Sequence, residues 1–168
     1  MKRLLLSATA LLAILNASAE EQTAVLTTSQ PAGQPVTLLV NATRAGVTVD
    51  WGDGTPQAYN STTNGGVLEI NGTLKGSEIT IKAAKGWKML AATGAGLTAV
   101  DLSKATELRS LYLQDNALTS INVANMAELR DLNLANNQLT AIALNSTKNP
   151  LIETLDLSNN PITATSFI

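Results

Sequence analysis

The stretch that decides the fold is LTAVDLSKATELRSLYLQDNA at residues 97–117, because the chain repeats this pattern twice more. Residues 118–138 read LTSINVANMAELRDLNLANNQ, and residues 139–161 read LTAIALNSTKNPLIETLDLSNNP. The three units are 21, 21 and 23 residues long. Self-similarity at a fixed period is typical of repeat architectures, so these residues predict stacked copies of one small structural unit.

Each unit contains the pattern L-x-x-L-x-L-x-x-N-x-L, with leucine or isoleucine at the apolar positions. The copies are Leu108, Leu111, Leu113, Asn116, Leu118; then Leu129, Leu132, Leu134, Asn137, Leu139; then Ile152, Leu155, Leu157, Asn160, Ile162. Residues 76–96 form a degraded copy in which Ile79 and Ile81 match Val100 and Leu102, Trp87 matches Leu108, and Leu90 matches Leu111. A stub begins at Ile162 and places Phe167 at the Leu144 position.

The spacing predicts where these side chains point. Leu111 and Leu113 face the same side of a short strand, because successive strand side chains point to opposite faces. The asparagine after each strand is interpreted as structural: its amide bonds the backbone of the turn, and the copies stack as a ladder of Asn116, Asn137 and Asn160. The opposite wall of the core is predicted at Ile121, Val123, Ile142 and Leu144. Residues 103–108 and 125–129 are each predicted to form one short helical turn.

These repeats resemble the leucine-rich repeat family, at the short end of its range of repeat lengths. The resemblance implies a β-rich α/β fold: a short right-handed solenoid of parallel strands with an irregular or short helical outer side. The chain resembles the secreted and surface leucine-rich repeat proteins of Bacteroides-like and internalin-type bacteria. By that resemblance, the chain is a non-enzymatic binding or adhesion module.

In this family, residues between the strand leucines face a concave surface and carry recognition. Carried over by position, they are Met89, Ala91 and Thr93; Ser110, Tyr112 and Gln114; Asp131, Asn133 and Ala135; and Thr154, Asp156 and Ser158, with Arg109 and Arg130 flanking the strands. Tyr112 is the only aromatic residue among them, and tyrosine suits an interface. Tyr112 has a second interpretation of equal weight, in which its side chain only covers the neighbouring strand.

Residues 20–75 differ in pattern and predict a small β domain, a β-sandwich-like cap on the first repeat. Short β-branched runs separated by turn residues predict strands at 23–28, 36–40, 47–51, 67–70 and 79–83. Residues 47–55, VTVDWGDGT, are similar to the W-G-D-G segment of polycystic-kidney-disease-type β modules. The predicted division is therefore a leader at 1–19, the β domain at 20–75, and repeats at 76–96, 97–117, 118–138, 139–161 and 162–168.

Asp50 and Asp53 in this segment leave two interpretations open. Two carboxylates are suited to calcium, which prefers several oxygen ligands. However, they are fewer than a dedicated calcium loop offers, and a turn anchored by Trp51 explains the same residues. We expect no metal site.

The first 19 residues predict export. Lys2 and Arg3 precede an apolar run at 4–15, and Ala17-Ser18-Ala19 fits a signal-peptidase site. The run is too short for a membrane span, which needs about 20 residues. Export combined with the absence of cysteine favours a bacterial source, because small secreted eukaryotic domains usually rely on disulfides.

Composition excludes several classes of function. The chain has no cysteine and no histidine, which excludes thiol nucleophiles, zinc–thiolate sites and Ser-His-Asp hydrolysis. Its formal charge of −2 argues against nucleic-acid binding. Asp131 and Asp156, with Glu153 nearby, are open to interpretation as the carboxylate pair of a periplasmic glycoside hydrolase. A shallow repeat face lacks the cleft that such chemistry needs, so we expect no catalytic residue and no cofactor.

The predicted partner is a protein or a surface glycan. We expect no membrane-spanning segment in this chain. Four strands present only a small face, whereas a stable interface covers about 800 Å² per partner. We therefore expect weak or multivalent binding, or a chain that is part of a longer protein. The alternative is a carbohydrate-binding accessory module that uses the β domain around Trp51.

Overall fold

The structure is a computed structural model that describes residues 21–41, 46–61, 65–84 and 86–167, with side chains through residue 163. The predicted leader at residues 1–19 lies outside this part of the chain. The strands are β1 (Gln22–Thr28), β2 (Pro35–Asn41), β3 (Val47–Asp50), β4 (Gln57–Tyr59), β5 (Val67–Thr73), β6 (Glu78–Ala83), β7 (Met89–Ala91), β8 (Leu97–Lys104), β9 (Ser110–Tyr112), β10 (Asp131–Asn133), β11 (Ala141–Leu144), β12 (Thr154–Asp156) and β13 (Ala164–Phe167).

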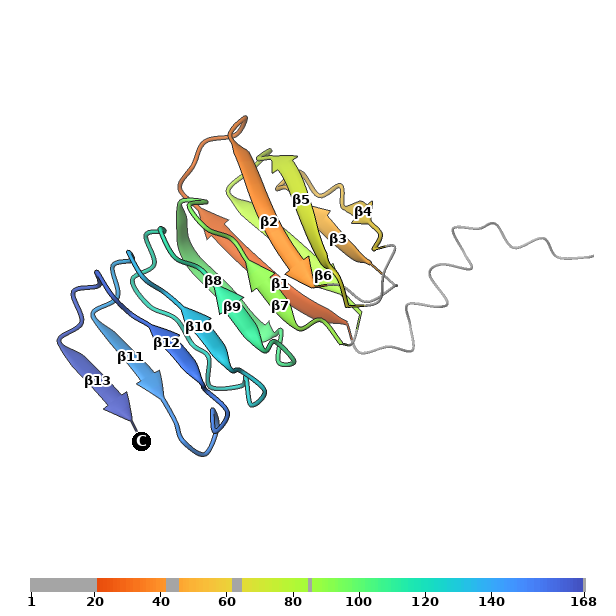
Figure 1. Cartoon of the computed structure of the whole chain (residues 1–168). Helices are drawn as coiled ribbons and strands as arrows, with labels where there is room; N and C mark the ends of the chain where they lie inside the picture. The colour runs from red at the N-terminus through yellow and green to blue at the C-terminus, as the bar shows by residue number, and fades with distance from the viewer. Residues whose placement is uncertain (1–20, 42–45, 62–64, 85, 168) are drawn as a thin grey trace, which may run out of the picture.

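The described strands form two large sheets and one small sheet (Figure 1). The five-stranded sheet has the order β4-β3-β6-β1-β8, and the six-stranded sheet has the order β12-β10-β9-β7-β2-β5. β11 and β13 form the two-stranded sheet. The five strands predicted before residue 84 are confirmed as β1, β2, β3, β5 and β6, with ends that differ by a few residues. The sequence did not predict β4.

The repeat register is confirmed by the backbone pairing. Parallel pairing aligns Leu90 with Leu111, Leu111 with Leu132, and Leu132 with Leu155. The degraded copy at residues 76–96 therefore contributes its strand, β7, at the expected position. Its first half does not stack on the next repeat, because β1 lies between β6, which contains Ile79 and Ile81, and β8, which contains Val100 and Leu102. β11 and β13 pair in parallel and align Leu144 with Phe167, which confirms the register of the stub.

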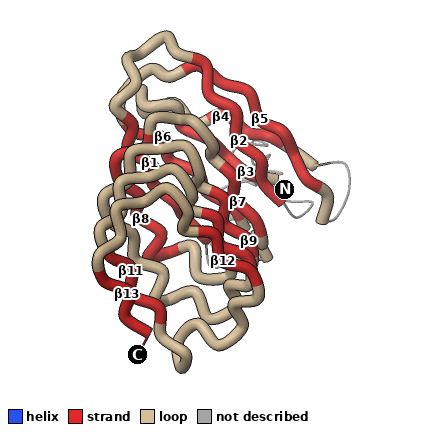
Figure 2. Tube along the Cα trace, turned by 60° about the vertical axis from the view of Figure 1, so that its left-hand side comes forward, coloured by secondary structure: helices blue, strands red, loops and turns tan. Residues whose placement is uncertain are grey.

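One apolar core fills the space between the sheets, which form two facing walls joined by turns in Figure 2. Alternation along each strand produces it: β1 buries Ala24 and Leu26, while β2 buries Leu38 and Val40. The repeat leucines continue the same core toward the C-terminus. Burial of aliphatic side chains from both walls is thus the main force that holds the sheets together.

The predicted fold class, an α/β solenoid of parallel strands preceded by a separate cap, is wrong. The described residues form strands and turns without helices, and both large sheets combine strands from the two halves of the chain. β1 pairs antiparallel with β8, and β2 pairs antiparallel with β7. Lateral hydrogen bonding explains this arrangement, because β7 and β8 would otherwise present unpaired edges to water. The division of the chain at residue 75 stays a prediction.

The short helical turns predicted at residues 103–108 and 125–129 are also wrong. The backbone makes isolated turn bonds there: Ala105 N to Leu102 O at 2.9 Å, and Met126 N to Val123 O at 3.0 Å. A repeat of 21 residues must cross both walls and return, which leaves too few residues on the outer side to continue a helical hydrogen-bond series.

Candidate functional site

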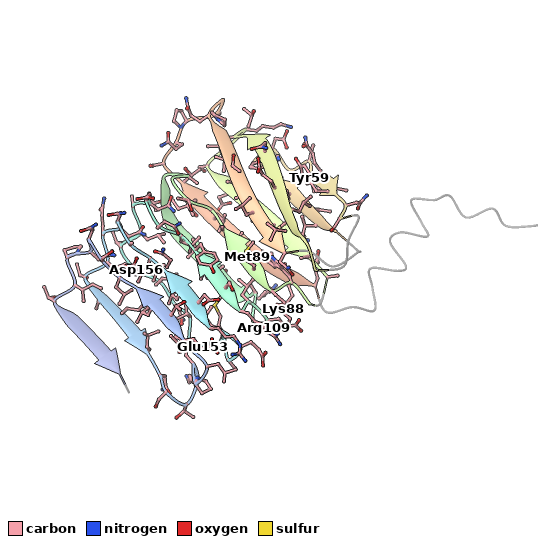
Figure 3. The ribbon with its side chains drawn as sticks, viewed as in Figure 1. Tyr59, Lys88, Met89, Arg109, Glu153 and Asp156 are labelled. Atoms are coloured by element: carbon pink, nitrogen blue, oxygen red, sulfur yellow. The ribbon has the colours of Figure 1, made fainter. Side chains whose placement is uncertain are left out.

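The outward face of the six-stranded sheet brings the predicted recognition positions together in two rows. Pairing aligns Met89, Ser110, Asp131 and Thr154 in one row, and Ala91, Tyr112, Asn133 and Asp156 in the other. Met89 and Asp156 are labelled on this sheet in Figure 3. Their neighbours along each strand, such as Leu111 and Leu132, point into the core. The rows are therefore the outward half of a strand alternation, although Ala91 is itself covered, with 8% of its surface exposed.

The rows continue onto β2 and β5, which the sequence analysis had not included. Asn41 lies beside Met89, and Leu39 lies beside Ala91. β5 then adds Val67 beside Asn41 and Glu69 beside Leu39. We call these outward residues of β12, β10, β9, β7, β2 and β5 the open face. The sequence carried only a weak signal of this extension: in VTLLVN at residues 36–41, Leu39 shares its alternation phase with the polar Thr37 and Asn41.

Asp131 lies at the centre of a hydrogen-bonded group on the open face. Its Oδ2 accepts a hydrogen bond from Ser110 Oγ at 2.9 Å, and its Oδ1 accepts one from Thr154 Oγ1 at 2.6 Å. These bonds link β9, β10 and β12 across the surface and fix the carboxylate in place. The arrangement presents a negative charge whose position is determined by its neighbours on both sides.

Asp156 has a different environment, at the end of β12. Its Oδ1 accepts the Ser158 backbone N–H at 2.9 Å, and hydrogen bonds from the Ser158 side chain and backbone lower the pKa of Asp156. A lowered pKa keeps the carboxylate ionised, whereas a general acid in glycoside hydrolysis needs a raised one. Asn133 makes the same local bond to Ala135 N at 3.0 Å.

Tyr112 and Gln114 are both half-buried on or beside β9. The side-chain oxygen Oε1 of Gln114 is shielded from solvent and has no hydrogen-bond partner within the described part of the chain. Gln114 is thus the least satisfied polar group among the predicted recognition residues.

The flanking arginines lie at one end of the strands and are held in ion pairs. Arg109 Nη2 lies 3.1 Å from Glu128 Oε2, and Arg130 pairs with Glu153. Lys88 Nζ lies 3.6 Å from Glu107 Oε2. Figure 3 shows Lys88, Arg109 and Glu153 along the same end of the sheet. Each base pairs with an acid from the following repeat, which reduces its availability to a ligand.

The three asparagines Asn116, Asn137 and Asn160 make matching hydrogen bonds in successive turns. Asn137 Oδ1 accepts the Leu118 N–H at 3.0 Å, and Asn160 Oδ1 accepts the Leu139 N–H at 2.9 Å. Asn116 Oδ1 accepts the Leu97 N–H at 3.0 Å. These amides therefore connect each repeat to the one before it, inside the fold rather than on the open face.

A second ladder, which the sequence analysis missed, lies beside the first. Asp115, Asn136 and Asn159 adopt left-handed backbone conformations with φ of 60°, 54° and 54°. Asn136 Nδ2 donates to Asp115 Oδ1 at 2.7 Å, and Asn159 Nδ2 donates to Asn136 Oδ1 at 2.6 Å. Asparagine and aspartate tolerate this conformation better than other residues with side chains. The signal was present as the residue pairs Asp-Asn, Asn-Asn and Asn-Asn at these positions.

Trp51 is a core residue, with 1% of its surface exposed. Its indole lies against Gly72, where a Cβ atom would overlap the ring, and its Nε1 donates to Tyr59 Oη at 3.2 Å. A sugar ring stacks on an exposed aromatic face, which Trp51 does not present. The alternative of carbohydrate binding through Trp51 is therefore not supported.

Asp50 and Asp53 organise the turn that follows Trp51. Asp50 Oδ1 accepts backbone N–H bonds from Gly52 at 2.9 Å and from Asp53 and Gly54 at 3.1 Å. Asp53 Oδ2 pairs with Lys75 Nζ at 2.6 Å, and the pKa of Asp53 is lowered to about 2 by Lys75 and then by Thr55. The described residues contain no group of three or more acids placed to hold a metal ion. This geometry matches the turn interpretation.

A pocket of about 320 Å³ lies away from the open face, at the last full repeat. It is lined by Leu144, Asn145, Ser146, Asn149, Pro150, Ile152 and Leu155. None of the predicted recognition residues contributes to it. Within the residues that the structure describes, no helix is long and apolar enough to cross a membrane.

A family model described as Leucine Rich Repeat matches residues 151–168. Comparisons with curated proteins and with solved structures gave no match. The matched segment contains Ile152, Leu155, Leu157, Asn160 and Ile162, which are the apolar and asparagine positions of the third repeat. The match is consistent with a protein-binding module. Together with the repeat register, the family match supports the interpretation of this chain as a leucine-rich repeat protein.

Proposed function

We propose that the chain is a non-enzymatic binding module that recognises a protein through the open face. The observation that supports this proposal most directly is the shared register of outward polar and aromatic residues on adjacent strands. Asp131 and Tyr112 belong to these rows, and hydrogen bonds fix the position of the Asp131 carboxylate. Fixed side chains lose little conformational entropy on binding, which favours recognition by such a surface.

The dimensions of the open face limit the partner that fits it. Six strands at a spacing of about 4.8 Å give a width of roughly 24 Å between the outer strands. Two rows of side chains along short strands add only about 10 Å in the other direction. A stable interface between globular proteins covers about 800 Å² per partner, which is several times this area. The face therefore suits an extended segment of a protein, or weak contacts made many times.

The experiment compares purified chain with a face variant in a binding panel of matrix proteins, epithelial cells and a glycan array. The variant carries Tyr112→Ala and Asp131→Lys, and the matched control carries Asp101→Lys on β8 of the other sheet. Binding to a protein that is lost in the face variant and kept in the control supports the proposal. Binding that both variants keep would refute recognition by the open face, and exclusive binding to glycans would refute a protein partner.

We further propose that residues 1–19 direct export and that the source is bacterial, as the sequence pattern and the family resemblance indicate. Expression in a bacterium with a Sec pathway tests the leader directly. The expected result is a product that begins at Glu20, found outside the cytoplasm by N-terminal sequencing of cell fractions. A product in the cytoplasm that retains residues 1–19 would contradict the proposal.

A further inference from the structure

The two ends of the open face differ in chemistry. Toward β5 and β2, the open face carries several apolar residues among polar ones: Val67 on β5 is 62% exposed, and Leu39, Met89 and Tyr112 on the next three strands are half-buried. Pairing places Leu39 beside Ala91, and Ala91 beside Tyr112, so these three residues are adjacent across β2, β7 and β9. On β5, Glu69 lies beside Leu39, and Val67 lies beside Asn41. We call Val67, Leu39, Met89, Ala91 and Tyr112 the apolar end. Val67 is the exposed large hydrophobic residue in the part of the chain that the structure describes.

Toward β10 and β12, the open face is acidic. Asp131 is held by two hydroxyl groups, and Asp156 is held by the backbone N–H of Ser158. Neither carboxylate is in an ion pair with a described lysine or arginine. The nearby bases, Arg109 and Arg130, pair instead with Glu128 and Glu153 at the end of the strands. We call Asp131 and Asp156 the acidic end.

These two ends select a partner by complementary charge and apolar contact. An acidic ligand would be repelled by two fixed negative charges that lack a cation of their own. A lysine or arginine side chain supplies the missing cation, and arginine matches a carboxylate through two parallel hydrogen bonds. An aromatic or aliphatic side chain would cover the apolar end, where Val67 is open to water.

The sheet geometry sets the distance between the two contacts. The centre of the apolar end lies between β2 and β7, and the centre of the acidic end lies between β10 and β12. These centres are three strand positions apart, which is roughly 14 Å at a spacing of about 4.8 Å. An extended chain advances about 3.3 Å per residue, so about four residues span this distance.

We propose that the open face binds an extended protein segment that carries an aromatic or aliphatic side chain about four residues from a lysine or arginine. This inference rests on the proposed function and adds the chemistry of the partner to it. The segment lies across the strands, with its apolar side chain over Leu39 and Tyr112 and its cation at Asp131 and Asp156.

The probe is a series of synthetic peptides with one Trp and one Arg in a Gly-Ser background, separated by about one to eight residues. Each peptide is displayed on a tetrameric carrier, because several weak contacts together give measurable retention of the purified chain. Matched peptides replace Arg by Glu or Trp by Ser. The expected result is strongest binding near a separation of about four residues, weakened by salt and lost in both matched series.

The protein variant that tests the acidic end is Asp131→Asn with Asp156→Asn, which removes both charges and keeps one acceptor oxygen at each position. At position 131 the amide NH2 group replaces the second acceptor and can donate to one of the two hydroxyl groups. Ion pairs at exposed carboxylates contribute little to affinity, so binding should weaken by only a few fold. Asp101→Asn is the matched control, because Asp101 Oδ1 accepts the Ser103 N–H at 2.9 Å on the other sheet, as Asp156 does with Ser158. This control should bind like the parent chain.

The outcomes separate this inference from the proposed function. Peptide binding that depends on Tyr112 but does not prefer Arg to Glu would overturn the basic partner and leave recognition by the open face intact. Equal binding at all separations would overturn the fixed spacing. If no peptide in the series shows Arg-dependent binding, the inference is overturned. In that case, loss of binding by the face variant in the protein panel would still support the proposed function.

Discussion

The side-chain amide of Asn137 donates a hydrogen bond to the carbonyl oxygen of Leu113, one repeat earlier in the chain, at 2.9 Å. The same amide donates to Leu134 O at 3.0 Å, and its oxygen accepts the Leu118 N–H at 3.0 Å. Asn137 is 6% exposed, so water does not replace these bonds when the side chain is removed. One buried amide therefore connects two repeats through their backbones.

Replacement of Asn137 by alanine should lower the free energy of unfolding by about 3 kcal/mol, because it leaves buried backbone groups without partners. Asn160→Ala should cost less, about 1 kcal/mol, because Asn160 is only half-buried. Urea unfolding monitored by circular dichroism measures both changes. Asn122→Ala is the control, since Asn122 is exposed and bonds only Ala124 N nearby. Equal losses for Asn137 and Asn122 would contradict this role.

Leu132→Asp should unfold the repeats. Leu132 is 1% exposed between Leu111 and Leu155, and burial of an unpaired carboxylate there costs more than about 4 kcal/mol. The control is Asn133→Asp, which adds the same charge one residue later on the outward face and keeps the acceptor for Ala135 N. Thermal melting should show a lost transition for the first variant and an unchanged one for the second. A normal transition for Leu132→Asp would mean that the repeat core is wrongly assigned.

Gln114→Met should stabilise the chain by about 1 kcal/mol, because it removes a buried oxygen that lacks a hydrogen-bond partner and keeps a side chain of similar length. Gln138→Met is the control, since Gln138 is exposed and should change little. The midpoint of urea unfolding reports the difference. A lower midpoint for Gln114→Met would show that this oxygen is satisfied in solution.

The ion pair between Asp53 and Lys75 predicts a pH dependence of stability. The pKa of Asp53 is lowered from 3.8 to about 2 in the folded chain, first by the Lys75 side chain and then by Thr55. A carboxyl with a lowered folded-state pKa stabilises the fold above its unfolded value and loses that contribution as the pH falls. The stabilisation from Asp53 should therefore be complete above pH 3.8 and disappear toward pH 2.

Lys75→Met removes the largest cause of this shift, so the variant should lose less stability than the parent between pH 3.8 and pH 2. Lys148→Met, at an exposed site in another repeat, is the control and should follow the parent curve. Urea unfolding at several pH values in this window gives the comparison. Identical slopes for the parent and Lys75→Met would exclude this ion pair as a source of acid sensitivity.

The repeat register was predictable because it is local and periodic. Leu90, Leu111, Leu132 and Leu155 each fall at the same position of a short pattern, and a stacked chain must align such positions to bury them. The strands of the first half were predictable for a similar reason, since alternation such as that of Ala24 and Leu26 has a period of two.

The second ladder and the extent of the open face were harder to predict from the sequence. Asp115, Asn136 and Asn159 look like ordinary polar turn residues until their positive φ angles and mutual hydrogen bonds are known. Leu39 looked like a core residue in an apolar run. Its place on the open face depends on the pairing of β2 with β7, which joins residues about 50 positions apart.

The sequence alone determined the repeat period, the inward leucines and the outward phase of Tyr112, Asp131 and Asp156, because these follow from the spacing of residues within one strand or one repeat. The tertiary structure decided that β1 and β2 pair with β8 and β7, and so that both halves share two sheets. Strand pairing between distant segments depends on which strand edges remain free after local folding. The spacing of residues within one strand or repeat does not determine this pairing. For the same reason, the sequence placed Asp131 and Asp156 on a face, but only the pairing showed that Leu39 and Val67 complete that face.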